Sequence, residues 1–148
     1  MTTIAFRPHT LADSLHIGEN MRACDRLELA LLGQDNPVAA IYRSAHISTY
    51  CEVIVVDGVP AVAFGVAPSA TAGQGTPWLL ATDRATPVAK RLVRSCHTKV
   101  QAMHQRYPRL RNIVHAENAV SINWLRWLGF TIGDVPCGPQ AKFLMFWR

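Results

Sequence analysis

Three side chains in this sequence are candidate proton acceptors for a reaction: Glu52, His115 and Glu117. His115 and Glu117 stand two residues apart at the end of a short apolar segment, where the two-residue repeat of a strand would place them on one side. Carboxylates and imidazoles are common general bases in enzymes. Each residue also has a structural interpretation: an isolated histidine in an apolar strand is more often a satisfied core residue, and Glu52 suits the solvent side of its strand. Glu117 and His115 are therefore the preferred candidates for a base, and Glu52 is a third candidate.

Basic residues gather around the start of a predicted long helix, which begins at Pro87 and continues to about Arg106. Arg84, Lys90 and Arg91 are the nearest cations. Unpaired N–H groups and the positive end of the helix dipole favour an anion at such a position. Pro87 fits the first helical position but contributes no N–H. The segment therefore predicts an anion site, and the alternative is a helix start with solvated basic side chains.

One strand–turn–helix segment has the clearest local signals. A strand is predicted over residues 112–116, and Asn118 is a good N-cap because its side-chain oxygen can accept from the free N–H groups of the first helical turn. The helix predicted over residues 119–128 contains neither proline nor glycine. Gly129 then suits the left-handed position after a helix, and Phe130 suits the apolar position that follows it. These signals agree with one another, so this segment is expected to organise the fold.

The same segment resembles a known family. Its spacing and its closing Gly-Phe pair are similar to the N-x-x-[AS]…GF signature of the GNAT superfamily of N-acetyltransferases. The run WLRWLGF after a strand most resembles small GNAT-like proteins carried by short-tailed bacteriophages. The residues that carry the resemblance are Asn118, Ser121, Trp124, Leu125, Gly129 and Phe130. It implies a single acyltransferase domain over residues 1–148, with an α/β (α+β) fold in which helices cover both faces of a mixed, splayed sheet of about six or seven strands.

The resemblance also implies acetyl-CoA as the cofactor. The family binds its pyrophosphate on a [QR]-x-x-G-x-[GA] loop at the start of the long helix, and the matching stretch here runs from Arg84 to Ala89, followed by Lys90 and Arg91. Pro87 stands where the family has glycine, so one potential phosphate donor is lost. The resemblance implies that the pantetheine arm is contacted by the strand predicted over residues 78–82 and by the motif helix predicted over residues 119–128. The residues implied are Leu80, Ala81 and Thr82 on the strand, and Asn118, Ser121 and Trp124 at the motif helix.

The catalytic residues of the family are matched less fully. Many relatives have a tyrosine four residues before the glycine of the Gly-Phe pair, where it can protonate the leaving thiolate, and this chain has Leu125 there. Trp124 beside it is a very weak acid. Transfer to an amine also needs a base, and Glu117, His115 and Glu52 are the candidates for it.

The elements that must position these residues can be predicted in chain order. Gly18 and Asn20 are expected to bend or split the helical segment that ends near Leu32. Asp57-Gly58 is the strongest hairpin signal, and the small, polar stretch 68–77 is expected to be a mobile loop. A hairpin together with strand–helix–strand units indicates a mixed sheet. Strands are predicted over residues 3–6, 50–56, 59–66, 78–82, 112–116 and 142–147, with a weak one after Phe130, in the order βααβββαβαββ.

Composition limits the kind of protein. A chain of 148 residues suits one domain, and an apolar share of 49% with 17% charged residues favours a folded chain. The four cysteines form no C-x-x-C pair, which argues against zinc and favours buried thiols. The chain shows no signal-peptide pattern and no apolar run of membrane-spanning length, so a cytoplasmic location is expected, in the host cytoplasm if the protein is viral.

The function expected is transfer of an acetyl group from acetyl-CoA to an amine, on a protein lysine, a protein N-terminus or a small molecule, with a host protein among the targets considered. The alternative is a catalytically inactive GNAT-fold interaction protein that binds and modulates a host protein, which Leu125 and Pro87 favour. Nucleic-acid binding through the basic long helix is disfavoured, because the sequence shows no alternation of aromatic and basic residues. No membrane partner is expected, and both a monomer and a homodimer are compatible with the sequence.

Overall fold

The computed structural model describes all residues, 1–148, and contains seven strands and five α helices. The chain forms two compact units: unit 1 comprises residues 1–67 and 78–88, and unit 2 comprises residues 68–77 and 89–148. The strands are β1 (Ile4–Pro8), β2 (Tyr50–Val56), β3 (Val59–Pro68), β4 (Gln74–Ala81), β5 (Arg109–His115), β6 (Thr131–Ile132) and β7 (Phe143–Trp147). The α helices are α1 (Leu11–Glu19), α2 (Ala23–Leu31), α3 (Pro37–Ile47), α4 (Ala89–Arg106) and α5 (Ala119–Trp127), and two 3₁₀ helices are η1 (Asp83–Val88) and η2 (Pro139–Ala141).

Hydrogen-bonded strand neighbours follow the order β1-β2-β3-β4-β5-β7-β6, and β4 contributes residues to both units. The pairs β1–β2, β2–β3, β5–β7 and β6–β7 are antiparallel, whereas β4 and β5 run parallel. The predicted mixed α/β fold is therefore confirmed. None of the helices has the length and apolar character that a bilayer-spanning segment requires.

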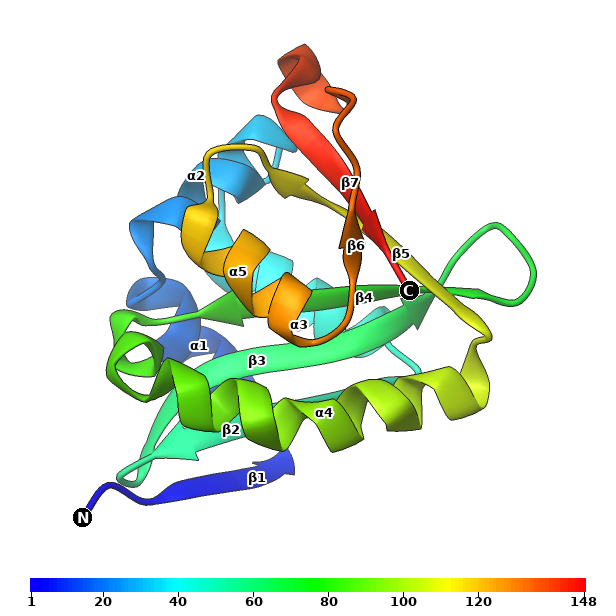
Figure 1. Ribbon diagram of the computed structural model, residues 1–148. Coiled ribbons are helices and arrows are strands. Elements are labelled where there is room, and N and C mark those ends of the chain that lie inside the picture. Colours follow the sequence, from blue (N-terminus) through cyan, green and yellow to red (C-terminus); the bar gives the residue numbers. More distant parts are fainter. The chain divides into compact units, whose positions relative to one another are not determined.

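Unit 1 combines a β hairpin with three short helices, and Figure 1 shows β1, β2 and β3 side by side. Asp57 and Gly58 in the hairpin turn both have positive φ angles, 49° and 78°, which a two-residue I′ turn requires. The helical segment predicted to bend or split is two helices, α1 and α2. They separate at Met21, which forms an isolated antiparallel bridge with Thr82. The predicted hairpin and the predicted interruption are both confirmed.

The core of unit 1 lies between these helices and strands. Gly18 lets α1 approach α3 closely, since a Cβ atom at this position would lie 2.7 Å from the Cα of Val38. Asn36 caps α3 by accepting from the N–H of Ala39 at 3.1 Å, and Pro37 follows in the first turn as expected. The buried apolar cluster consists of Ile17, Met21, Leu29, Ala40, Ile41, Val53, Ala63 and Leu80.

Unit 2 places the long helix α4 in the same body as the strand–turn–helix segment. Figure 1 shows β5 and β7 side by side, and their antiparallel register runs from Arg111↔Trp147 to His115↔Phe143. Gly129 has a φ of 87°, and the ring of Phe130 meets Phe146 edge to face at 5.3 Å, so the predicted helix stop is confirmed. The buried face of α4 consists of Leu92, Val93, Cys96, Val100 and Met103.

Several predicted boundaries are wrong. Strand β3 continues to Pro68 and β4 begins at Gln74, so much of the predicted loop 68–77 is strand. Strand β5 begins at Arg109 instead of residue 112. Both extensions follow from one parallel pairing, Gln74↔Arg109 and Gly75↔Leu110, which overrides the weak strand propensity of these residues. That ladder covers two residues at one end of each strand.

The entry into α4 also differs from the prediction. Pro87 does not occupy the first position of the α helix; it lies inside the 3₁₀ helix η1, and α4 begins at Ala89. A 3₁₀ turn at a helix start is a common connector, and the fixed φ of proline is compatible with it. The segment that aligns with the family's glycine-containing loop, Arg84 to Ala89, is therefore helical throughout.

Candidate active site

The turn between β5 and α5 holds two of the candidate residues. Strand β5 ends at His115, and Asn118 caps α5 by accepting from the N–H of Ser121 at 3.2 Å. His115 is buried, with 6% of its surface exposed, and its ring meets Phe143 edge to face at 5.7 Å. Its Nδ1 accepts from the N–H of Glu117 at 3.3 Å. This contact places the proton of the neutral ring on Nε2, so His115 is set to donate at Nε2 rather than to accept a proton there.

The predicted shared face of His115 and Glu117 is wrong. Glu117 lies in the turn after the strand and is exposed, whereas His115 is buried. The tight turn is the physical reason, because the N–H of Asn118 donates to the His115 carbonyl at 3.0 Å and the strand cannot continue. Glu117 therefore has a solvent-accessible carboxylate, which an amine could approach.

Glu52 lies in unit 1, on β2, opposite Phe64 of β3. It is half-buried and accepts a hydrogen bond from the hydroxyl of Tyr50, two residues earlier on the same strand. Beside it, burial raises the pKa of the Cys51 thiol to about 11, and the charge of Glu52 adds to the effect. A thiol with this pKa is protonated at neutral pH, so Cys51 is a poor nucleophile.

The predicted anion-binding cations all lie on the surface. Arg84 is exposed in η1 of unit 1, and Lys90 and Arg91 are exposed in the first turn of α4 in unit 2. Ala89, the first residue of α4, is half-buried. The exposed cations of the first turn and the positive dipole end of an 18-residue helix act in the same direction on a nearby anion.

The predicted backbone donors of β4 are already engaged inside unit 1. The N–H of Ala81 donates to Oδ2 of Asp25 at 2.8 Å, and the N–H of Thr82 donates to the carbonyl of Ala61 at 2.8 Å. The carbonyl of Ala81 accepts from the N–H of Arg22 at 2.9 Å. Ala81 and Thr82 therefore do not offer N–H groups to a ligand in this arrangement, which counts against the predicted contacts of these two residues. Leu80 belongs to the buried cluster.

A buried ion pair holds this end of β4. Arg22 donates to Asp25 from Nε at 3.0 Å and from Nη2 at 2.8 Å, and both side chains are buried. This pair is not among the residues predicted from the sequence. The sequence feature that could have predicted it is the three-residue spacing of Arg22 and Asp25 at the start of α2, because side chains three residues apart on a helix lie close together.

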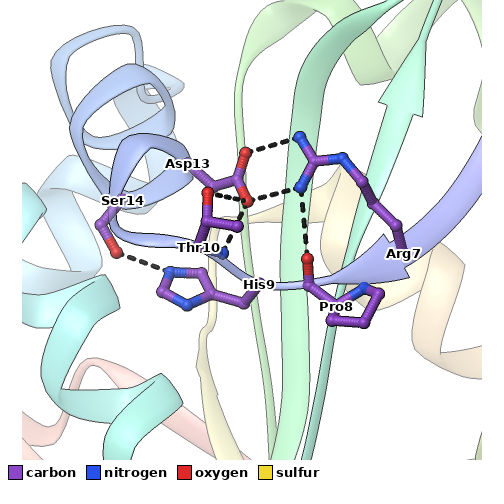
Figure 2. A network of polar contacts seen from close by, with 6 residues as sticks. All are labelled: Arg7, Pro8, His9, Thr10, Asp13 and Ser14. Carbon is purple, nitrogen blue, oxygen red and sulfur yellow. Dashed lines mark hydrogen bonds and ion pairs between the residues drawn. The ribbon is translucent and has the colours of Figure 1, made fainter.

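A second polar network surrounds the start of α1 (Figure 2). Arg7 donates to both carboxylate oxygens of Asp13 at 2.7 and 2.8 Å, and the N–H of Thr10 donates to the same carboxylate at 2.8 Å. Burial alone would raise the pKa of Asp13, but the bonds from Arg7 and Thr10 outweigh it and the net pKa is lowered. His9 Nε2 lies 2.7 Å from the hydroxyl of Ser14. Ser14 has no exposed surface and Asp13 is directed to Arg7, so this is a capping network and not a nucleophilic serine site.

The remaining predicted residues lie on α5. Trp124 is buried, with 8% of its surface exposed, which is typical of a core residue rather than an open contact surface. Ser121 and Leu125 are half-buried. Leu125 carries no ionisable proton, so α5 offers no acid at this position.

The chain is similar in fold to known proteins, although its sequence is not. No protein-family model matches the sequence, and no curated protein sequence matches it. Among solved structures, the chain is similar to the PaiA N-acetyltransferase from Thermoplasma acidophilum in complex with coenzyme A, with a TM-score of 0.66 and 15% identity over 99% of this chain and 98% of that one. It is also similar to a putative acetyltransferase from Salmonella typhimurium with its cofactor acetyl-CoA, with a TM-score of 0.60 and 16% identity over 98% and 92% of the chains.

A third similar structure is that of a named member of the GNAT family. It is a GNAT-family acetyltransferase from Bacillus anthracis, with a TM-score of 0.67 and 8% identity over 97% of this chain and 92% of that one. At these identities the likeness concerns the fold, and it extends over nearly the whole chain. The chain therefore has the GNAT fold.

Proposed function

We propose that this protein binds acetyl-CoA and transfers its acetyl group to an amine. The observation that carries the proposal is the agreement of the fold, over nearly the whole chain, with acetyltransferases that include structures with coenzyme A and with acetyl-CoA bound. The motif of Asn118, Gly129 and Phe130 supports the proposal independently, because it forms a capped helix with the stop that the family signature describes.

In unit 2, the first turn of α4 would hold the anionic part of the cofactor. Lys90 and Arg91 are exposed there and supply two positive charges. Pro87 removes one N–H from the preceding segment, so these side chains carry more of the interaction than a glycine-containing loop would require. Asn118 would contact the pantetheine arm while it continues to cap α5.

Bound acetyl-CoA supplies the thioester whose acetyl group passes to the amine nitrogen, with release of the free thiol. The chain must take the proton from an ammonium acceptor before the nitrogen can attack. Glu117 is assigned this role, because its carboxylate is exposed and His115 has its Nδ1 engaged by the N–H of Glu117. Leu125 cannot protonate the thiolate, but thiols ionise near pH 8.5 in cysteine, so the leaving group departs without strong acid catalysis. Turnover is expected to be slow.

The charge-reversal variant Lys90→Glu/Arg91→Glu tests the cofactor site. Acetyl-CoA binding is expected to weaken at least about tenfold, roughly 1.4 kcal/mol, because attraction to the pyrophosphate becomes repulsion. Isothermal titration calorimetry measures the affinity. The matched control is Lys99→Glu/Arg106→Glu, which reverses the same number of charges farther along α4. If the folded Lys90→Glu/Arg91→Glu variant binds acetyl-CoA as tightly as the wild type does, the cofactor pyrophosphate does not bind at the first turn of α4.

Binding without turnover is the second candidate function. Leu125 and the engaged N–H groups of Ala81 and Thr82 favour it, since an acid and two potential carbonyl-polarising donors are lost. An inactive protein would bind acetyl-CoA and release no thiol with any acceptor. The resemblance to bacteriophage proteins predicts that an acceptor or partner occurs in a bacterial host lysate, which an acetylation assay on lysate proteins would identify.

A further inference from the structure

The charges of this chain are divided unequally between its two units. Unit 2 contains ten Lys and Arg residues and two Asp and Glu residues, whereas unit 1 contains five and eight. Unit 2 therefore has a formal charge of +8 and unit 1 a formal charge of −3. Strong asymmetry of this kind is typical of a surface that meets a polyanion.

Helix α4 concentrates the positive charge of unit 2. It carries five Lys and Arg residues and no acidic residue along its 18 positions. Arg94 and Arg106 are exposed, as are the two cations of the first turn. No carboxylate lies between these side chains on the helix, so their positive charges act together on an approaching anion.

A pocket of about 300 Å³ opens on this helix. Four of its lining residues, Lys90, Val93, Arg94 and His97, recur at the spacing of one helical face, and the fifth is Trp127 from the end of α5. Trp127 is 50% exposed, although burial of a tryptophan ring is strongly favourable. The pocket thus joins an exposed indole ring, two permanent cations and a histidine, all within unit 2.

We propose that this pocket and the exposed face of α4 bind single-stranded nucleic acid, with an unpaired base on Trp127 and a flanking phosphate on Arg94, while Lys90 and Arg91 are left to the cofactor proposed above. Base stacking on an exposed aromatic ring beside a cationic groove is the common recognition mode for single strands. A duplex offers no free base face to the indole. The sequence alone disfavours nucleic-acid binding, because aromatic and basic residues do not alternate along the chain. The structure creates this combination by bringing the end of α5 to α4.

The test is fluorescence anisotropy of a labelled oligothymidylate of about 15 nucleotides, a length within the range of single-strand sites. Wild-type protein is expected to bind this strand more tightly than a duplex of equal length, with an affinity that falls as salt rises. Trp127→Leu should weaken binding at least about fivefold, and Trp127→Tyr should retain most of it, because the ring supplies the stacking. Arg94→Glu should weaken binding and reduce the salt dependence.

Matched controls come from unit 1, where Tyr42 and Arg43 are an exposed aromatic residue and an exposed cation on α3. Tyr42→Ala and Arg43→Glu should leave the affinity unchanged. No detectable binding, equal affinity for the duplex, or equal effects of the Trp127 variants and the Tyr42 control would each overturn the proposal. Displacement of the strand from Trp127 by acetyl-CoA with simple competition would assign the pocket to the cofactor and overturn it as well. Binding that depends on Trp127 and persists at saturating acetyl-CoA would support it.

Discussion

Asp25 connects three parts of unit 1 through one carboxylate. It accepts from Arg22 at the start of α2 and from the N–H of Ala81 at the end of β4, and it is buried. Removing one partner of a buried ion pair leaves an uncompensated charge, which costs much more than the pair contributes relative to an apolar replacement. The position of the β4 end therefore depends on this side chain more than on any local propensity.

Asp25→Ala is expected to lower the free energy of unfolding by about 3–5 kcal/mol, because Arg22 stays buried without its carboxylate. Urea unfolding followed by circular dichroism measures the change. Asp35→Ala is the control, since Asp35 is an exposed residue between α2 and α3 and should change stability by less than about 0.5 kcal/mol. A loss at Asp25 no larger than that at Asp35 would mean that Arg22 readily reaches solvent.

His9 makes stability sensitive to mild acid. Burial lowers the pKa of His9 from its ordinary value of 6.5, and the attraction of Asp13 opposes this without reversing it. The folded state therefore binds fewer protons than the unfolded state, so stability present above pH 6.5 is lost as the pH falls below that value. Asp13, with its lowered pKa, contributes a loss only in stronger acid, below its ordinary value of 3.8.

The measurement is urea unfolding of the wild type and of His9→Gln between about pH 7.5 and pH 5, a window around the ordinary histidine pKa. The wild type should lose stability on acidification, and the variant should lose less. His46→Gln, at an exposed position on α3, should behave like the wild type. Identical stability profiles of the wild type and His9→Gln across this pH range would show that protonation of His9 does not destabilise the folded protein.

At the scale of elements, two asparagine caps allow structure and binding to be separated. Asn118 caps α5 and Asn36 caps α3, each by accepting from a backbone N–H in the first turn, at 3.2 and 3.1 Å. Asn118→Ala and Asn36→Ala should both cost about 1 kcal/mol of stability, the usual loss for a helix cap. Because Asn118 is also proposed to meet the pantetheine arm, its variant alone should weaken acetyl-CoA binding. Calorimetry measures the acetyl-CoA affinity of both variants under conditions in which they are equally folded. A lower affinity of Asn118→Ala alone would indicate a lost ligand contact, whereas equal affinities would indicate that only the helix cap was lost.

The elements also show what could be predicted from the sequence. Asp57-Gly58, Asn118 and Gly129 act through their own backbone geometry, so their turn, cap and helix stop were predictable from local rules. The start of β4 at Gln74 depends on parallel pairing with β5, more than 30 residues away, and no local signal marks it. The functional residues divide in the same way. The role of Asn118 as the cap of α5 was predicted correctly, whereas the side of the strand on which Glu117 lies depends on the tight turn between β5 and that cap.

At the scale of the whole molecule, the GNAT fold alone does not determine which side chains assist a reaction, so each side chain has to be considered separately. In the proposed acetyl-CoA chemistry, the departures at Pro87 and Leu125 reduce the number of groups that would assist the reaction. Unit 2 contains the proposed cofactor cations, the Asn118 cap and the proposed base Glu117. The account therefore predicts that this protein turns over slowly and depends strongly on a single carboxylate.

The most direct test of that claim is release of free thiol from acetyl-CoA in the presence of polyamine, peptide and bacterial-lysate amines. The account predicts acceptor-dependent release that Glu117→Gln reduces by about 10²–10⁴-fold, the usual contribution of a general base. Glu19→Gln, which changes an exposed carboxylate at the end of α1, should leave the rate unchanged. Full activity in Glu117→Gln would contradict the dependence on this carboxylate, although the proposed reaction itself would stand. Tight acetyl-CoA binding with no thiol release above spontaneous hydrolysis for any acceptor would contradict the account.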